Sequence, residues 1–303
     1  MTKREEHSHN PDSETHGVMV DAVTGATTTG HDWDGIQELN NPLPRWWLWS
    51  FYATIVWAIG FWIFYPSWPL INTFTPGTLN WSSRGAVSEE LQNLREQRSD
   101  MMSRLNTAST AEIEADPDLL SFARGLARPA FGDNCSPCHG AGGGGAKGYP
   151  NLNDDSWLWG GTLADIEQTI RFGIRSGHDE ARIGDMPAFG RDGMLPRADI
   201  VAVADYVLSM SGLPVSTPAN LVKGAKVFAD NCAACHGTEG KGNQELGAPN
   251  LTTGIWLFGP ERETIIDGVW HGRGSVMPAW EGRLDDTTIK ALTVFVHTLG
   301  GGQ

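Results

Sequence analysis

The chain has 303 residues, which is enough for two or three domains. It carries 36 Asp and Glu against 22 Lys and Arg, a net charge of −14. This acidic balance argues against nucleic acid as a partner, because phosphates require a basic surface. It permits docking onto a basic protein.

The polar tail formed by residues 1–45 is expected to lack regular structure up to about Gly30. Its three early histidines are interpreted as solvated residues without partner ligands: His7, His9 and His16.

A long apolar segment follows the tail. No Asp, Glu, Lys or Arg lies between Arg45 and Arg84, and seven of the 13 tryptophans lie in or beside this stretch. About twenty helical residues span the hydrocarbon core of a bilayer, and tryptophan gathers at its interfaces. Residues 46–66 are therefore predicted to be a transmembrane helix in contact with membrane lipid. The alternatives are a buried helix and a signal peptide, but the segment begins too late for a signal peptide and lacks a small-residue cleavage site.

Residues 67–117 are predicted to be a linker or helical stalk. Within it, residues 87–107 have an incomplete apolar stripe and acidic residues near their start, which indicates a helix capped by Ser88.

All four cysteines occur in two copies of one pattern, "NCSPCHG" (134–140) and "NCAACHG" (231–237). A disulfide within Cys-x-x-Cys closes too short a loop to stabilise much, and zinc sites place their histidines further along the chain. Cys-x-x-Cys-His is the attachment signature of haem c. The pattern predicts two covalently bound haem c groups, on Cys135 and Cys138 and on Cys232 and Cys235, with His139 and His236 as axial iron ligands.

The repeat extends far beyond the cysteines. "GYPNLNDDSWLWG" (148–160) matches "GAPNLTTGIWLFG" (247–259), "QTIRFGIRSG" (168–177) is aligned with "ETIIDGVWHG" (263–272), and "MPAF" (186–189) matches "MPAW" (277–280). Two tandem homologous domains, residues 118–212 and 213–303, explain this order. The fold is expected to be mainly α, with one N-terminal transmembrane helix followed by two tandem class I cytochrome c domains.

Each repeat also supplies a candidate second axial ligand. Met186 and Met277 occupy matching Met-Pro-Ala loops, and a His/Met pair is a common axial set in electron-carrying cytochromes. Pairing of each methionine with the haem of its own repeat is the default expectation, and the crossed pairing stays open. His178, His271 and His297 do not repeat, and His271 is expected to meet a haem propionate or solvent.

Three further features are expected to support the haems. The carbonyls of Pro150 and Pro249 are predicted to accept the second N–H of the axial imidazoles, which would orient the rings. Trp157 and Trp256 are predicted to fill the haem pockets. The glycine run "GAGGGGAKG" (140–148) lacks the end of a phosphate-binding loop and is interpreted as a flexible loop.

The segment from His31 to Pro69, and above all "WDGIQELNNPLPRWW" (33–47), resembles the N-terminal part of the dihaem subunit III of cbb3-type cytochrome c oxidases, the FixP/CcoP-like family. The tandem haem motifs also fit that family. The resemblance implies a relay of electrons from a donor cytochrome c to a monohaem cytochrome c subunit and then to a catalytic haem–copper subunit. No catalytic residue is predicted on this chain, since His/Met ligation leaves no open iron position.

Haem c attachment on the outer face of a bacterial inner membrane places the haem domains in the periplasm and the tail in the cytoplasm. Two rival readings stay open. A dihaem peroxidase would need an open iron position, and a free membrane-tethered electron shuttle fits the haem motifs equally well.

Overall fold

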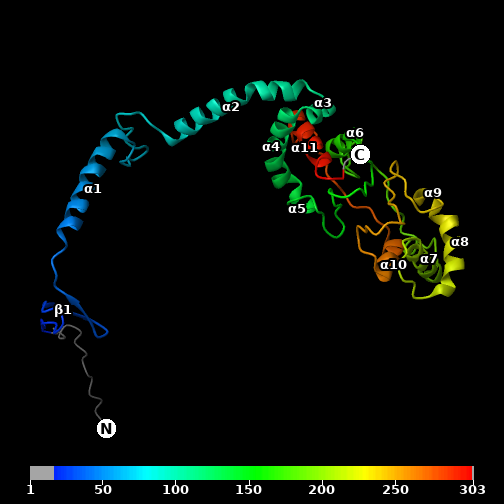
Figure 1. Cartoon of the computed structure of the whole chain (residues 1–303), viewed down its shortest axis with the longest axis horizontal. Coiled ribbons are helices and arrows are strands. Elements are labelled where there is room, and N and C mark those ends of the chain that lie inside the picture. Colours follow the sequence, from blue (N-terminus) through cyan, green and yellow to red (C-terminus); the bar gives the residue numbers. More distant parts are fainter. Residues whose placement is uncertain (1–16, 302–303) are drawn as a thin grey trace, which may run out of the picture. The chain divides into compact units, whose positions relative to one another are not determined.

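The computed structural model describes residues 17–301 and divides after Leu94 into two compact units (Figure 1). The histidines noted at positions 7, 9 and 16 lie outside the described residues. The fold is mainly helical, as predicted, with one candidate membrane-spanning helix in the N-terminal unit.

A small β-hairpin in the N-terminal unit was not predicted. Strands β1 (Thr28–Trp33) and β2 (Ile36–Leu39) pair antiparallel around Asp34 and Gly35, which both have positive φ, 53° and 87°. An Asp-Gly pair at these two positions favours a type I′ turn, the tight turn that fits the twist of a hairpin. The carboxylate of Asp32 accepts the N–H of Gly35 at 2.6 Å and closes the turn.

Helix α1 (Arg45–Phe64) corresponds to the predicted apolar segment. It is 20 residues long and buries none of its side chains within the protein. Among residues 17–301 it is the one helix long and apolar enough to cross a membrane. The helix ends before Tyr65, because the proline that follows this residue disfavours helical backbone at it.

The stalk helix is confirmed, but its start differs from the prediction. Helix α2 (Ser83–Thr107) begins four residues earlier than residue 87, and Ser82 Oγ accepts the N–H of Gly85 at 3.0 Å. Ser88, the predicted cap, lies inside the helix and donates its hydroxyl to the carbonyl of Arg84. Near the C-terminal end of α2, Leu105 is fully buried.

The C-terminal unit continues with short helices joined by long loops. They are α3 (Thr110–Ala115), α4 (Pro117–Asn134), α5 (Ser136–His139), α6 (Leu163–Phe172), α7 (Arg197–Met210), η1 (Pro218–Asn220), α8 (Leu221–Asn231), α9 (Ala233–His236), α10 (Arg262–His271) and α11 (Asp286–His297). Their apolar faces form two separate cores.

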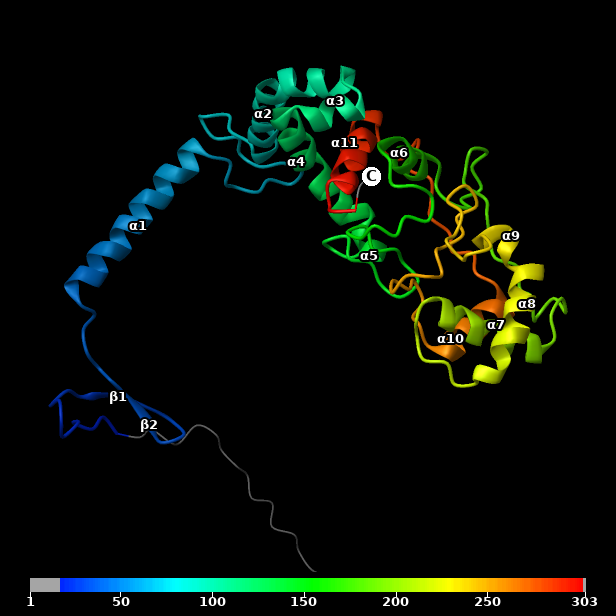
Figure 2. The ribbon, with the colours of Figure 1, turned by 45° about the vertical axis from the view of Figure 1, so that its right-hand side comes forward.

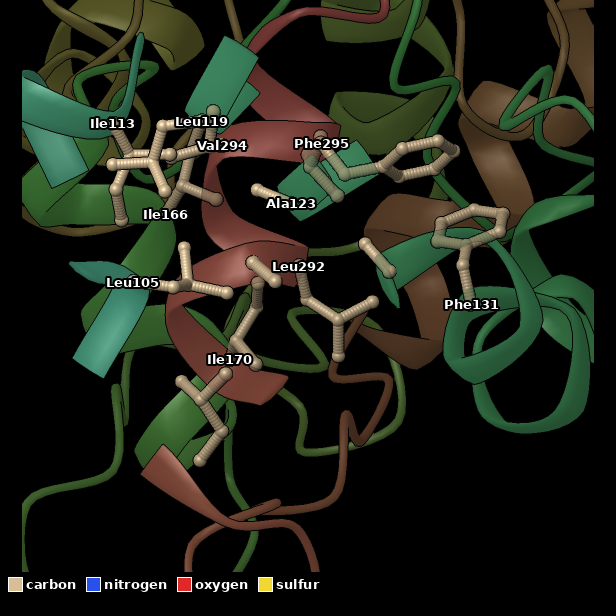
Figure 3. Packing of buried hydrophobic residues seen from close by; sticks show 14 residues of the cluster. Leu105, Ile113, Leu119, Ala123, Phe131, Ile166, Ile170, Leu292, Val294 and Phe295 are labelled. Carbon is tan, nitrogen blue, oxygen red and sulfur yellow. The ribbon is translucent and has the colours of Figure 1, made fainter. Parts of the chain in front are cut away.

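The first core is built around α4, α6 and α11 (Figure 3). Helix α4 buries a residue at every fourth position from Leu119 to Phe131, which produces one continuous apolar stripe. Two members of this stripe are alanines, Ala123 and Ala127, whose small side chains leave room for α11. Four residues before Cys135, the ring of Phe131 lies 5.3 Å from that of Phe295.

The second core is built around α7, α8 and α10. Helix α8 approaches α7 at Gly224, where a Cβ atom would lie 2.3 Å from the carbonyl oxygen of Ala202. The rings of Phe228 and Tyr206 lie 5.5 Å apart. This pair occupies the position in the second core that Phe131 and Phe295 occupy in the first.

The two cores do not follow the predicted domain boundaries at 118–212 and 213–303. Helix α7, the last helix of the first repeat, packs on α8 of the second repeat, and α11, the last helix of the second repeat, packs on α4 of the first. Figures 1 and 2 both place α11 beside α4 and α6, and α7 beside α8 and α10. The repeat in the sequence is therefore real, but the two repeats exchange their last helices.

A buried ion pair joins the exchanged helix to its new surroundings. Asp205 of α7 is fully buried, and its carboxylate accepts two bonds from Arg262 of α10, at 2.6 and 3.0 Å. Asn220 of η1 donates a third bond at 2.7 Å. The Arg262 guanidinium beside Asp205, together with Asn220, holds the pKa of this carboxyl below its usual value.

We predict that Asp205→Ala lowers the free energy of unfolding by about 3 kcal/mol, because it removes the buried partner of Arg262 and leaves only the exposed Glu263 beside the guanidinium. Since the folded-state pKa of Asp205 is lowered, its contribution is present above the pKa of the unfolded chain and is lost as the pH falls through the folded-state value. Thermal unfolding at pH 7 and at pH 3 measures both effects, and the difference between variant and parent should shrink at the lower pH.

The matched control is Asp230→Ala, which removes an exposed ion pair with Lys226 and should change stability by less than about 1 kcal/mol. Equal losses in the two variants, or a loss for Asp205→Ala that does not depend on pH, would contradict the prediction.

Candidate functional site

The two Cys-x-x-Cys-His motifs adopt the same local structure. Helix α4 ends at Asn134, and the next residue, Cys135, leads into the single turn of α5. The amide of His139 donates to the carbonyl of Cys135 at 2.9 Å. In the second repeat, α8, Cys232 and α9 repeat this arrangement, again with a bond of 2.9 Å. Each motif therefore forms a compact turn that places two thiols and one imidazole at the end of a helix.

The two thiols of each motif differ in exposure. Cys135 and Cys232 face the cores, and burial raises the pKa of each to about 11. Cys138 and Cys235 are exposed. All four sulfur atoms are free in the structure, so each turn offers one inner and one outer thiol for attachment to a flat group lying against the core.

The imidazoles are held by the predicted proline carbonyls. His139 Nδ1 lies 3.0 Å from the carbonyl oxygen of Pro150, and His236 Nδ1 lies 3.0 Å from that of Pro249. These bonds confirm the predicted support, and they leave Nε2 of each ring as the nitrogen able to bind a metal. Partial burial lowers the pKa of His236, which favours the neutral ring that a metal ligand requires.

The glycine run was interpreted as a flexible loop, but it forms a bonded scaffold. Gly145 donates to the carbonyl of His139 at 2.7 Å, and the carbonyl of Gly143 accepts from Leu152 at 2.7 Å. The second repeat has the same two bonds, from Gly242 to His236 and from Leu251 to Gly240. The recurrence of these glycines 97 residues apart was a signal in the sequence that could have identified the scaffold.

The methionine loops lie against opposite cores. Met277 of the second repeat packs against the first core, which also contains Cys135, and Met186 of the first repeat packs against the second core, with Cys232. The default expectation paired each methionine with the haem of its own repeat, whereas in the structure each methionine packs against the core that contains a cysteine of the other repeat.

The structure also corrects one step of the repeat alignment. Helices α6 and α10 are each ten residues long and end before Gly173 and Gly272, which both have positive φ. The expected alignment set Gly173 against Gly268 instead. Gly173 therefore matches Gly272, which lies four residues beyond Gly268.

The two pocket tryptophans differ in their bonding. The indole N–H of Trp157 donates to the carbonyl of Gly301 near the C-terminus. Nε1 of Trp256 is buried, and within residues 17–301 it has no hydrogen-bond partner. A buried N–H without an acceptor costs stability, so this atom fits a site completed by a group that carries oxygen acceptors, such as a haem propionate.

The three histidines considered as rival ligands all meet carboxylates. His178 Nε2 lies 3.3 Å from Glu281, and His297 Nδ1 lies 3.0 Å from Glu114. His271, expected beside a propionate or in solvent, is exposed and has Nδ1 at 2.9 Å from Asp267. Each of these imidazoles therefore contacts a carboxylate that lies outside the two motif turns.

Two cavities of about 420 and 430 Å³ lie where loops of the two repeats meet. One is lined by residues 144–151 together with residues 255–259, and the other by the matching segments, residues 241–250 together with 155–158. Among the described residues, the lining of neither cavity includes a cysteine or the histidine of a motif. The cavities therefore belong to the contact between the repeats rather than to the thiols.

The donor set and its surroundings fit haem c at both turns. Each turn offers two free thiols, an imidazole fixed through Nδ1 and an apolar core with a methionine loop packed against it, and the second offers an unmatched indole N–H as well. These features define a c-type cytochrome with two motif turns and, among the described residues, one candidate membrane helix.

The chain belongs to the FixP/CcoP family of cbb3-type cytochrome c oxidase subunits. Residues 25–72 match the family described as the N-terminal domain of cytochrome oxidase-cbb3, FixP. Residues 127–207 and 219–296 each match cytochrome c oxidase, cbb3-type, subunit III.

Individual relatives are similar to this chain along nearly its whole length. The cbb3-type cytochrome c oxidase subunit FixP of Azorhizobium caulinodans is 61% identical over 291 residues, which is 96% of this chain and 98% of the relative. Subunit FixP of Bradyrhizobium diazoefficiens is 60% identical, covering 93% of this chain and 98% of the relative. Subunit CcoP of Cereibacter sphaeroides is 48% identical, covering 91% and 95%.

We predict that Gly145→Ala distorts the loop that presents the carbonyl of Pro150. At this position φ is +70°, and a Cβ atom would lie 2.7 Å from the backbone of Tyr149 and Asn151. The variant should lose about 2 kcal/mol of stability, and its melting temperature should fall by about 6 °C. A weakened bond between His139 and Pro150 should also raise the potential of a haem bound by this ring, because the imidazole becomes a poorer donor.

The control is Gly142→Ala, where the added Cβ meets nothing within 4 Å. Thermal unfolding and redox titration of both variants provide the comparison. Equal changes in melting temperature and in haem potential for Gly145→Ala and Gly142→Ala would contradict the prediction.

Proposed function

We propose that this chain is the dihaem electron relay of a cbb3-type oxidase. It takes electrons from a donor cytochrome c and passes them to a monohaem cytochrome c subunit, which feeds a catalytic haem–copper subunit. Membership in the FixP/CcoP family supports this role. The observation that carries it is the pair of matched motif turns, each with its imidazole bonded through Nδ1 to a proline carbonyl.

The cysteines of the two sites attach the cofactors, and the histidines and methionines bind the iron. Cys135 and Cys138 attach one haem c, and Cys232 and Cys235 attach the other. His139, His236, Met186 and Met277 are the axial ligands. Each haem, when bound, supplies a one-electron iron couple, and a thioether ligand raises its potential.

The protein around the sites orients these ligands and limits the access of water. The proline carbonyls fix the imidazole rings, and the cores cover the inner thiols. Because a histidine and a methionine would both bind each haem iron, the chain would offer no open position for a substrate. We therefore propose that it transfers electrons and makes or breaks no substrate bonds.

The chain is also proposed to have a fixed orientation in the bacterial inner membrane. Helix α1 crosses once, with the tail before Arg45 in the cytoplasm and the haem units in the periplasm. This follows from the side on which haem c is attached. Lys3 and Arg4 in the tail, with Arg45 at its end, agree with the positive-inside bias.

Protease added to intact spheroplasts tests the orientation. We expect digestion of the haem units, while an epitope placed at the N-terminus stays protected until the membrane is opened. The same epitope on the cytoplasmic face of a known inner-membrane protein is the control. Removal of the N-terminal epitope from outside would reverse the proposed topology.

The relay itself is tested with the full-length chain purified in mild detergent. Reduced donor cytochrome c should reduce its haems rapidly, while oxygen uptake stays at the background rate. Purification of the intact complex should bring down the haem–copper and monohaem subunits with this chain. Replacing Cys135 and Cys138 by Ala within that complex should strongly reduce oxidation of the donor.

Carbon monoxide binding by the catalytic subunit should be unchanged in that variant complex, which shows that the loss lies in the relay. Rapid oxygen consumption by the isolated chain would identify an enzyme instead. A chain that purifies without the other subunits yet exchanges electrons with the donor would indicate a free membrane-tethered shuttle.

A further inference from the structure

Short stretches of paired backbone hold the two methionine loops. Ile174 pairs with Met277 on one side, through two hydrogen bonds of 3.0 Å, and with Arg182 on the other. Arg273 pairs with Met186 through bonds of 2.9 and 3.2 Å. Successive residues on extended backbone face opposite sides. The side chains next to these paired residues therefore face away from the methionine side chains.

The side that faces away from the methionines carries exposed apolar side chains. Ile183 is 79% exposed, and Val276, which precedes Met277, is 64% exposed. Leu246 is 44% exposed, and its carbonyl oxygen lies against Gly184, where there is no room for a Cβ atom. We name Ile183, Leu246 and Val276 the apolar patch. Single exposed apolar residues are common, but neighbouring ones indicate a contact surface.

Arg175 joins the segments that make up the apolar patch. Its Nε donates to the carbonyl of Ser275 at 2.7 Å, and its Nη1 donates to the carbonyl of Gly184. Ser275 precedes Val276 in the chain, and Gly184 follows Ile183. The two bonds therefore tie the two segments together, so that the apolar patch is one surface and not two independent loops.

Exposed carboxylates form an acidic border around the apolar patch. Each lies within two residues of a patch member or in the loop that joins Arg175 to Arg182. They are Asp179, Glu180, Asp185 and Glu245. Two arginines of the same segments are paired with other carboxylates, Arg182 with Asp165 at 3.1 Å and Arg273 with Asp267 at 3.2 Å. The four carboxylates outnumber Arg175, so the border presents net negative charge to a partner.

We propose that the apolar patch and its acidic border form the docking surface for the donor cytochrome c, which meets it with basic side chains around an apolar centre. This inference rests on the proposed function, since it requires a donor. Opposite charges across the border raise the rate of encounter, and burial of the apolar centre stabilises the complex. A donor seated there contacts the loops of both methionines.

The test of the border uses the full-length chain in mild detergent and a basic mitochondrial cytochrome c as the probe. Asp179→Lys, Glu180→Lys and Glu245→Lys together should slow electron transfer from the reduced probe about tenfold at low salt, and added salt should then have less effect. Stopped-flow absorbance measures both. The same probe with succinylated lysines is acidic, and it should react faster with this triple variant than with the parent.

The matched control places three lysines on other exposed surfaces. It combines Asp118→Lys on α4, Asp230→Lys on α8 and Glu263→Lys on α10, which changes the net charge by the same amount. Its rate with the basic probe should stay close to that of the parent, because the contact itself is unchanged. Haem content and absorption spectra should match in all chains, which separates loss of docking from loss of the fold.

The apolar centre is tested at high salt, where attraction between charges is screened. Ile183→Ser with Val276→Ser should slow the reaction about tenfold under these conditions, because less apolar surface is buried in the complex. The control is Val222→Ser, at a valine of α8 that is 86% exposed and does not belong to the patch. Its rate should equal that of the parent.

Two results would overturn the inference while the proposed function stands. One is rapid electron transfer from the probe at equal rates in the patch variants and their controls. The other is an unchanged reaction with the probe together with loss of the monohaem subunit on purification, which would identify the patch as an interface within the oxidase. A parent chain whose haems take no electrons from the probe would refute the proposed function as well.

Discussion

The contact on which the C-terminal unit depends is the packing of a motif-bearing helix against the last helix of the other repeat. Helix α4 carries the first motif and is covered by α11, and α8 carries the second and is covered by α7. Both contacts bring an aromatic pair together close to the cysteines, Phe131 with Phe295 and Phe228 with Tyr206. Without these helices the inner thiols would lose the apolar surface that they face.

The two contacts are alike in shape but different in chemistry. In the second core α7 contributes Asp205, paired with Arg262 of α10, whereas the matching part of the first core contains the fully buried Val294. If α7 packed in the first core instead, Asp205 would lose Arg262 and become an unpaired buried charge, which is strongly unfavourable. The ion pair therefore favours packing of α7 in the second core over packing in the first.

The sequence alone predicted the local chemistry well. The motif turns, the proline carbonyls at His139 and His236, the stalk helix and the length of α1 follow from short patterns whose meaning does not depend on distant residues. The exchange of last helices was not predictable in this way. Helices α7 and α11 share the same spacing of apolar residues, and although α7 also buries Asp205, periodicity cannot tell which core each helix joins. The hairpin was not predicted, although the Asp34-Gly35 pair is a turn signal in the sequence. The bonded glycine loop was not predicted either, because the interpretation used the glycine content of residues 140–148 and not the recurrence of the glycines at matching positions.

The exchange of the last helices also has a consequence for the order of folding during synthesis. The partners of the second core are near one another along the chain, as Asn220 and Asp205 are, 15 residues apart. The first core must wait for the end of the chain, since Thr287 donates to Asn106 across 181 residues and Trp157 donates to Gly301 across 144. Closing the longer loop costs about 2 kcal/mol more in chain entropy. The half of the C-terminal unit that is made first is therefore the half that finishes folding last, and its motif turn stays uncovered until α11 has been made.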